Sequence, residues 1–247
     1  RALGMRALVP ASARRSRRVI VDSASTRDEL VRHLRTPAAK VDVVPLAAAP
    51  PDVVPAPEAG LRARLGLGDR PIVVSPGAKR PHKNLAAVLD AMATIPEVER
   101  PVLVATGYAT PYDEELRAHA ARLGIADDLV MPSWLEKADL EGLYAAATLV
   151  VFVSRSEGFG LPVLEAMMRG VPVVTSDRSS LPEVAGDAAL LVDPGDVQAI
   201  ASAMRTVLTD PVRRTQLADA GRRRAAGFSW ERTAELTAAS YRRALGG

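Results

Sequence analysis

The sequence contains no cysteine, only three histidines and few aromatic residues, and each shortage narrows the possible chemistry. Without cysteine, the chain can form neither a disulfide framework nor a thiolate metal site, and it has no thiol nucleophile. The histidines, His33, His82 and His119, are too far apart in the sequence to predict a zinc site. Long apolar runs are also absent, and the chain does not open with a signal-peptide pattern. We therefore expect a cytoplasmic protein without a metal site.

Lysine is scarce as well, and most strong cations are arginines. The lysines are Lys40, Lys79, Lys83 and Lys137. The net charge of +3 is modest, and we expect no nucleic-acid partner. One basic cluster lies near the beginning of the chain: Arg14, Arg15, Arg17 and Arg18. Peripheral contact with an anionic membrane or polymer and a solvated helix face are both open for this cluster.

What the chain does contain is enough apolar sequence, 48%, to bury at least one core. From Arg70 onward, short runs of Val, Ile and Leu alternate with amphipathic segments, which is typical of βαβ units around a parallel sheet. The predicted strands are Ile72–Ser75, Val102–Thr106, Leu129–Met131, Leu149–Val153, Val171–Thr175 and Ala189–Val192. The predicted helices between them are Leu85–Ala93, Asp113–Leu123, Lys137–Ala146 and Pro162–Arg169. We expect an α/β fold with a doubly wound parallel sheet.

Capping patterns give the helix ends. Gly124 and Gly170 stand where C-terminal caps belong, Asp210 before a proline indicates a helix start, and Ser229 is expected to cap the last helix. Two S/T-x-x-E capping boxes are expected to open helices, one at Thr26 with Glu29 and one at Ser180 with Glu183.

The first 50 residues repeat the α/β pattern on a smaller scale, with strands at Val19–Asp22 and Val41–Val44. We interpret residues 1–50 as the end of an α/β domain that lacks its beginning. Residues 51–60 are rich in proline and are interpreted as a stiff linker. Residues 61–228 then form the larger domain, and residues 229–247 a final amphipathic helix.

The segment Ser156–Met167 directly follows an apolar strand and predicts a phosphate site. Gly158 and Gly160 allow close approach of the backbone, and Pro162 marks the first turn of a helix whose free N–H groups favour an anion. Glu165 is expected in that first turn with its carboxylate in the same cleft, and Glu157 in the loop. Two acceptors beside an anion site suit a ligand with hydroxyls on both sides of its phosphates. The alternative is that Glu165 complements the helix dipole and Glu157 is merely solvated.

Glu157 and Glu165 form an E-x7-E pattern, and the residues between them resemble glycosyltransferase family 4. The resemblance continues through 169–176 and 179–189 and upstream through 143–147, so that almost the whole chain is similar to the C-terminal domain of these enzymes. It implies a GT-B fold in which 61–228 binds the nucleotide sugar, while the final helix returns toward the N-terminal domain. It also implies that Glu157 contacts the donor sugar and Glu165 the ribose hydroxyls. Backbone amides of the loop, from Gly158, Phe159, Gly160 and Leu161, would bind the donor.

A second segment, Gly77–Asn84, follows the first strand of the larger domain and holds four potential cations. Point charges beside a glycine turn suit a diphosphate. The segment resembles a G-x-x-K-P-H-K-N variant of the family, which implies that Lys83 binds phosphate and Gly77 approaches the donor. Either Lys79 or Arg80 is expected to act as the second cation. His82 is left open between the site and a solvated turn.

Ser133 and Trp134 follow another strand, where the family places the nucleotide base, although Trp134 is equally compatible with the core. The resemblance implies transfer of a sugar from a nucleoside-diphosphate sugar to an acceptor hydroxyl, with retention of configuration. It implies no cofactor and no obligatory metal, and the chain has no D-x-D pair near the phosphate site. Expected partners are the sugar-nucleotide donor, a glycan or lipid-linked acceptor, and an absent N-terminal domain or partner chain.

Other functions of an α/β protein would leave different sequence patterns. A dinucleotide-dependent dehydrogenase is disfavoured because no G-x-G-x-x-G follows the first strand. A sugar-nucleotide epimerase of the GT-B type and a non-catalytic binding subunit both stay open.

Overall fold

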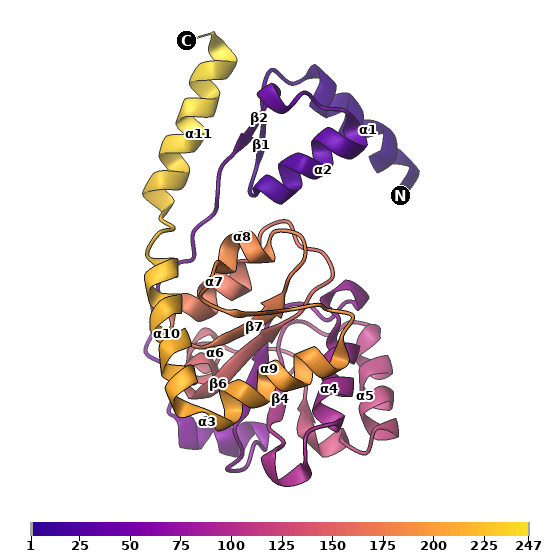
Figure 1. Cartoon of the computed structure of the whole chain (residues 1–247), viewed down its shortest axis with the longest axis vertical. Helices are drawn as coiled ribbons and strands as arrows, with labels where there is room; N and C mark the ends of the chain where they lie inside the picture. The colour runs from indigo at the N-terminus through magenta and orange to yellow at the C-terminus, as the bar shows by residue number, and fades with distance from the viewer. Residues whose placement is uncertain (1, 247) are drawn as a thin grey trace.

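The computed structural model describes residues 2–246, and the side chains of residues 8–246. It contains two parallel sheets, which belong to a larger and a smaller unit (Figure 1). The larger sheet has the strand order β5-β4-β3-β6-β7-β8. Its strands are β3 (Ile72–Ser75), β4 (Val102–Ala105), β5 (Leu129–Val130), β6 (Ala147–Phe152), β7 (Val173–Ser176) and β8 (Leu190–Val192). The expected doubly wound α/β sheet is confirmed, and its order reverses between β3 and β6.

Helices cover both faces of this sheet, as strands that are apolar throughout require. One core packs under α3 (Glu58–Leu65), α6 (Lys137–Ala146), α7 (Leu161–Met168) and α8 (Leu181–Ala185). The other packs under α4 (Leu85–Ala93), α5 (Tyr112–Arg122) and α9 (Val197–Thr209), and α10 (Pro211–Ala225) contributes to both. Short 3-10 turns also occur: η1 (Ala38–Lys40), η2 (Pro81–Lys83), η3 (Glu97–Glu99) and η4 (Ala126–Asp128). The bounds predicted for these strands and helices are right to within two residues.

Most of the predicted caps are present. Gly124 and Gly170 follow α5 and α7 with φ of 71° and 68°, the left-handed conformation that glycine adopts at low cost. Asp210 accepts a hydrogen bond from the N–H of Arg213 at the start of α10, and Ser229 does the same for Arg232 at the start of α11 (Trp230–Leu245).

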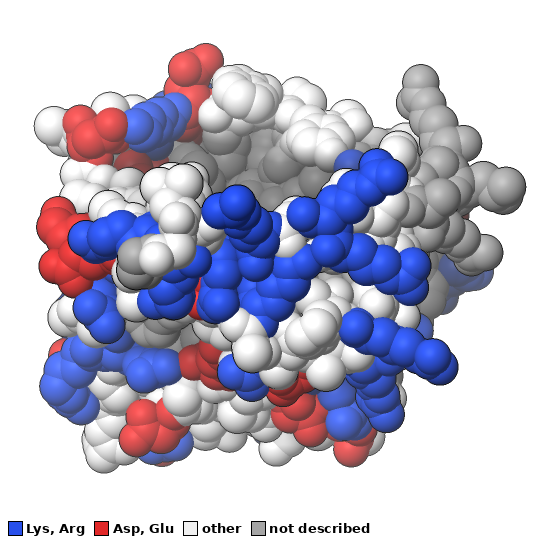
Figure 2. Space-filling model, turned by 90° about the horizontal axis from the view of Figure 1, so that it is seen from above, with Lys and Arg blue, Asp and Glu red and all other residues white. Residues whose placement is uncertain are grey.

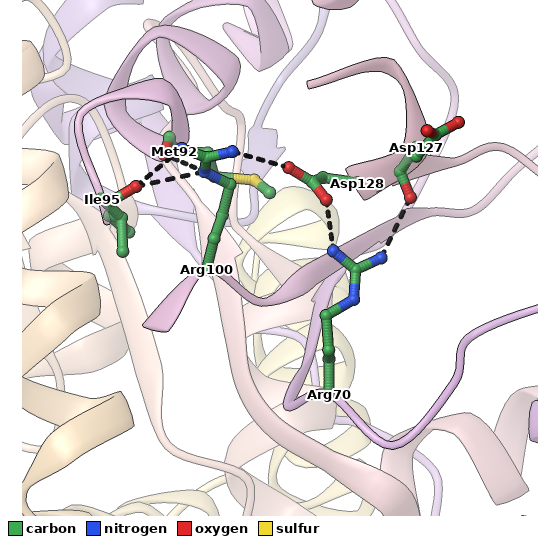
Figure 3. A network of polar contacts seen from close by, with 6 residues as sticks. All are labelled: Arg70, Met92, Ile95, Arg100, Asp127 and Asp128. Atoms are coloured by element: carbon green, nitrogen blue, oxygen red, sulfur yellow. Dashed lines mark hydrogen bonds and ion pairs between the residues drawn. The ribbon is translucent and has the colours of Figure 1, made fainter. Parts of the chain in front are cut away.

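The amino ends of three neighbouring strands are tied together by one carboxylate. Arg70 precedes β3, Arg100 precedes β4 and Asp128 precedes β5, and both guanidinium groups bind the buried Asp128 (Figure 3). Arg100 also donates to the carbonyls of Met92 and Ile95. This network holds together the end of the sheet at which these three strands begin, opposite to their carboxyl ends.

The smaller unit consists of α1 (Ala2–Arg15), β1 (Val19–Val21), α2 (Ala24–Leu34) and β2 (Val41–Val43). The capping box expected at Thr26 is wrong, because α2 begins earlier. Its N-cap is Ser23, whose hydroxyl accepts a hydrogen bond from the N–H of Thr26. After β2 the chain runs without regular structure to α3, which begins at Glu58, inside the predicted linker 51–60.

Helix α11 leaves the larger unit and runs beside the smaller one (Figure 1). Asp42 of β2 accepts hydrogen bonds from Ser240 and Arg243 of α11, as well as from Arg18. Thr233 donates to the carbonyl of Pro45. The last helix is therefore held to the chain segment that precedes the larger unit.

Basic side chains form a band over the end of the molecule that carries the smaller unit (Figure 2). Arg14, Arg15 and Arg17 are exposed, whereas Arg18 is half-buried and paired with Asp42. Arg18 thus contributes to packing rather than to a solvated cluster. None of the helices in the described part of the chain is long and apolar enough to cross a membrane.

Candidate functional site

The two segments singled out by sequence meet where the order of the large sheet reverses. The loop from Pro76 to Asn84 follows β3, and the loop from Val153 to Gly160 follows β6, the neighbour of β3. Carboxyl ends of parallel strands at such a reversal form the crevice in which open α/β sheets bind ligands.

Lys83 and Glu157 are in direct contact across this crevice. The Nζ atom of Lys83 donates to Oε1 of Glu157 at 2.7 Å, and the two side chains are only 19% and 14% exposed. Nζ also lies 4.7 Å from the centre of the Phe152 ring. A single ammonium in this position is partly desolvated, so an anion that enters the crevice gains more from it than from a surface lysine.

The loop that carries Glu157 is held by two serines. The N–H of Glu157 donates to the hydroxyl of Ser179, and the hydroxyl of the buried Ser180 lies 3.1 Å and 2.7 Å from the carbonyls of Glu157 and Phe159. The capping box expected at Ser180 with Glu183 is therefore wrong. Ser180 stands before α8, but its hydroxyl serves this loop, and Glu183 binds elsewhere.

Helix α7 begins directly after this loop. Gly160 has φ of 115°, a conformation that favours glycine, and a Cβ atom there would lie 2.7 Å from the side chain of Leu181. Pro162 is in the first turn, as expected. Within residues 2–246, no hydrogen bond uses the backbone N–H groups of Phe159, Gly160 or Leu161. These amides at a helix N-terminus provide a site for an anion.

The ring of Phe159 belongs to the core. It is 4% exposed and packs edge-on against Phe228, with ring centres 6.0 Å apart. Only the backbone of Phe159 is thus available to a ligand. Leu161 is partly buried against the same core.

Glu165 lies in the second turn of α7 rather than in the first, but its side chain reaches the crevice. It lines a cavity of about 270 Å³ together with Gly77, Gly107, Trp134 and Tyr144. Burial raises the pKa of Glu165, Arg169 opposes this effect and Glu141 adds to it. Arg169 is itself bonded to Glu141, and no described group donates a hydrogen bond to the Glu165 carboxylate. The carboxylate of Glu165 is therefore half-buried, faces the cavity and accepts no hydrogen bond in the described structure.

The other wall of this cavity comes from two glycines and an indole. A Cβ atom on Gly107 would lie 2.5 Å from the carbonyl oxygen of Gly77, so the two loops approach as closely as their backbones permit. Trp134 is 73% exposed, which excludes the core position left open by the sequence. Ser133 is exposed beside it but does not line the cavity.

The two candidates for the second cation differ sharply in environment. The side chain of Lys79 is fully buried, and its Nζ atom lies 2.8 Å from the carbonyl of Gly107, 3.3 Å from that of Tyr108 and 3.5 Å from Asp113. This ammonium already has its partners and ties two loops together, which argues against a role in binding phosphate. Arg80 is exposed, and within the described residues it donates only to the hydroxyl of Tyr108. His82 is exposed as well. Arg80 is the cation that a ligand can reach.

Asn84 is a residue of this site that the sequence reasoning did not single out. It has φ of 63°, a conformation that asparagine tolerates better than most residues. Its buried side chain donates to the carbonyls of Val153 and Pro194 and accepts from Arg155. Asn84 thereby ties the loop that carries Lys83 to the carboxyl end of β6. Within the described residues, no group of three or more His, Asp or Glu side chains is arranged to hold a metal ion.

A family model described as "Glycosyl transferases group 1" matches residues 60–224, the segment that contains every element of this crevice. The chain belongs to the group 1 glycosyl transferases. Among its curated relatives, the O-antigen chain mannosyltransferase B of Escherichia coli is 33% identical over 228 residues, 91% of this chain and 60% of that protein. The D-inositol 3-phosphate glycosyltransferase of Segniliparus rotundus is 33% identical over 239 residues, 94% and 53% of the two chains.

Solved structures of the same fold agree with this assignment. Sucrose-phosphate synthase from Thermosynechococcus elongatus is 28% identical, with a TM-score of 0.78 over 92% of this chain and 58% of its own. HepE of Anabaena, solved in complex with UDP and glucose, is 22% identical, with a TM-score of 0.85 over 97% and 66% of the two chains. The GT-B fold is thus confirmed. The present chain spans little more than half the length of the curated relatives it matches.

Proposed function

We propose that this chain forms the donor-binding part of a retaining glycosyltransferase of family 4, which transfers a sugar from a nucleoside-diphosphate sugar to an acceptor hydroxyl. The observation that carries the proposal is the crevice at the sheet reversal. There Lys83 and the free amides before α7 lie beside a cavity that contains the unpaired Glu165. A role in the synthesis of cell-surface polysaccharides or glycoconjugates is consistent with the name of the Escherichia coli relative, an O-antigen chain mannosyltransferase.

In this arrangement the diphosphate lies between Lys83 and the N-terminus of α7. Departure of the diphosphate builds negative charge, and fixed amides together with Lys83 and Arg80 stabilise that charge electrostatically. Lys83 exchanges part of its contact with Glu157 for a phosphate oxygen, which frees the Glu157 carboxylate for the hydroxyls of the sugar. We propose that no metal ion and no cofactor takes part.

The nucleoside occupies the cavity beside Trp134. Glu165 accepts hydrogen bonds from the ribose hydroxyls, which supply the partners that its carboxylate lacks. In a mostly apolar cavity, the few polar groups of the lining fix the orientation of the ligand.

We further propose that the acceptor, a glycan or a lipid-linked sugar, binds between this chain and an N-terminal domain or partner chain. Without that second wall the acceptor is not positioned and water is not excluded. These effects are together worth about 7 to 11 kcal/mol of barrier. The 247-residue chain alone is therefore expected to bind the donor nucleotide without detectable transfer. Transfer by the purified chain as a monomer would contradict this expectation.

Calorimetry with UDP-, GDP- and ADP-sugars tests the binding proposal. Lys83→Ala is expected to weaken binding of whichever nucleotide binds by about 2 to 4 kcal/mol, because it removes a partly desolvated charge from the diphosphate. Lys137→Ala is the matched control. Lys137 also forms an ion pair, with Asp52, but both of these side chains are exposed to solvent. Equal affinity of Lys83→Ala and the parent would remove Lys83 from the site.

Substitutions of Glu157 and Glu165 are expected to weaken the binding of different ligands. Glu165→Gln weakens both the free nucleotide and the sugar nucleotide if the carboxylate binds ribose, whereas Glu157→Gln weakens only the sugar nucleotide. The same titrations measure both variants. If both variants bind the free nucleotide with the same loss, the roles assigned to the two side chains are wrong.

A further inference from the structure

The start of helix α2, in the smaller unit, touches the loop that precedes α7. The hydroxyl of Ser23 donates to the carbonyl oxygen of Gly158 at 2.6 Å, and that of Thr26 donates to the same atom at 3.1 Å. A Cβ atom on Gly158 would lie 3.3 Å from the carboxylate of Asp22. Ser23 is completely buried. The two units therefore meet at the loop that precedes α7.

A second contact fixes α2 in this position. Both carboxylate oxygens of Glu183 lie 2.9 Å from the N–H of Ala24, and one lies 3.3 Å from the N–H of Ser25. A carboxylate at the first amides of a helix is stabilised by hydrogen bonds and by the helix dipole. Arg224 of α10 donates to the carbonyls of Glu183 and Val184, so this anchor is itself held within the larger unit.

The Gly158 carbonyl differs from the other polar groups of its loop. Ser179 and Ser180, both in the larger unit, hold the N–H and carbonyl of Glu157 and the carbonyl of Phe159. In the described structure the smaller unit alone provides the hydrogen bonds to the Gly158 carbonyl. Separation of the units would leave this one peptide free to rotate.

The same peptide carries an amide of the proposed anion site. The carbonyl of Gly158 and the N–H of Phe159 lie in one plane and point in opposite directions, because the peptide bond is planar and trans. When Ser23 and Thr26 hold the carbonyl, they also direct the Phe159 N–H away from the smaller unit. The orientation of this donor thus depends on where α2 is docked.

We propose that Ser23, Thr26 and Glu183 are positioning residues that couple the placement of the two units to diphosphate affinity. Docking of α2 through Glu183 brings the two hydroxyls onto Gly158 and thereby sets the Phe159 amide for the ligand. This inference rests on the proposed function, because it takes the loop to be the diphosphate site.

Calorimetry with UDP and GDP on the full chain tests the coupling. Ser23→Ala and Glu183→Gln are each expected to weaken nucleotide binding about 3- to 10-fold, the range of one or two lost hydrogen bonds. Ser23→Thr keeps the hydroxyl and is expected to retain most of the affinity. Ser25→Ala is the matched control, because the Ser25 side chain makes no hydrogen bond in the described structure.

A distance measurement separates this role from a general loss of stability. The chain has no native cysteine, so spin labels at Arg32→Cys in α2 and Gln198→Cys in α9 report only the spacing of the two units. Glu183→Gln is expected to broaden the distance distribution, while Ser23→Ala leaves it narrow and still loses affinity. The labels are added in the parent, Ser23→Ala and Glu183→Gln backgrounds.

The outcomes are distinct for the two proposals. Unchanged affinity in Ser23→Ala and Glu183→Gln, with loss in Lys83→Ala, overturns the positioning role and leaves the proposed function intact. A distribution that Glu183→Gln does not change overturns the docking role of Glu183. If the parent binds no nucleotide of the panel, the proposed function fails, and the positioning role fails with it.

Discussion

The larger and smaller units are stabilised in different ways. Every residue of β3, β4 and β7 is buried, whereas β1 and β2 each contain only one buried residue and α2 contains no buried apolar residue. The smaller unit also has an open apolar groove of about 540 Å³ between α1, β1 and α2. Its position relies on directional polar contacts, through Asp42, Ser23 and Glu183. Apolar burial therefore stabilises the larger unit, while polar contacts place the smaller unit against it.

The largest expected effect comes from matched truncations in the two units. Leu103→Ala, in the middle of β4, is expected to cost about 2 to 5 kcal/mol, because it removes a completely buried side chain and leaves a cavity. Leu30→Ala, in α2, is expected to cost less than about 1 kcal/mol, since its side chain is only partly buried and lines the open groove. Urea unfolding followed by circular dichroism measures both. Equal losses would show that the smaller unit has a core of the same kind.

A smaller effect is expected when a polar contact of the smaller unit is removed. Asp42→Asn weakens the contacts with Arg18, Ser240 and Arg243, and we expect a cost of about 2 kcal/mol. Hydrogen exchange is expected to increase in β1, β2 and α11 and to stay unchanged in β3 and β6. Asp52→Asn is the control, because Asp52 and Lys137 form a solvent-exposed ion pair, and such pairs contribute little to stability. Faster exchange throughout the large sheet would contradict a contact that serves only the smaller unit.

The strands and helices of the larger unit could be predicted because their signals are local. Apolar runs such as Ile72–Ser75 and the glycine caps at Gly124 and Gly170 depend on residues close in the sequence. The crevice followed from the same pattern, since loops after neighbouring parallel strands meet at one edge.

What could not be predicted depends on contacts between distant residues. Ser180 and Glu183 have the spacing of a capping box, yet they bind Glu157 and Ala24, which only the fold brings near. Lys79 and Arg80 are adjacent cations, and the sequence does not reveal that Asp113 and the carbonyl of Gly107 enclose the first of them.

The smallest expected effect is a change of stability with pH. The sign of this change is opposite for a carboxyl group in the smaller unit and one in the larger unit. In the smaller unit, the hydrogen bond from Arg18, aided by Ser240 and Arg243, lowers the pKa of Asp42 from 3.8 to about 2. A carboxyl whose pKa is lower in the folded than in the unfolded chain contributes stability above its unfolded pKa. This contribution is lost as the pH falls from about 4 toward 2.

Glu165 in the larger unit behaves in the opposite way. Burial raises its pKa above the ordinary value of 4.5, so folding disfavours the charged form, and stability is lost as the pH rises through that range. Glu165→Gln is therefore expected to raise the unfolding temperature at pH 7 by less than about 3 °C and to have no effect below about pH 4. Thermal unfolding of the parent, Glu165→Gln and Asp42→Asn at both pH values measures the contrast. A lower unfolding temperature for Glu165→Gln at pH 7 would mean that the carboxylate is stabilised in the folded protein, and that the cavity does not hold an acceptor in need of a partner.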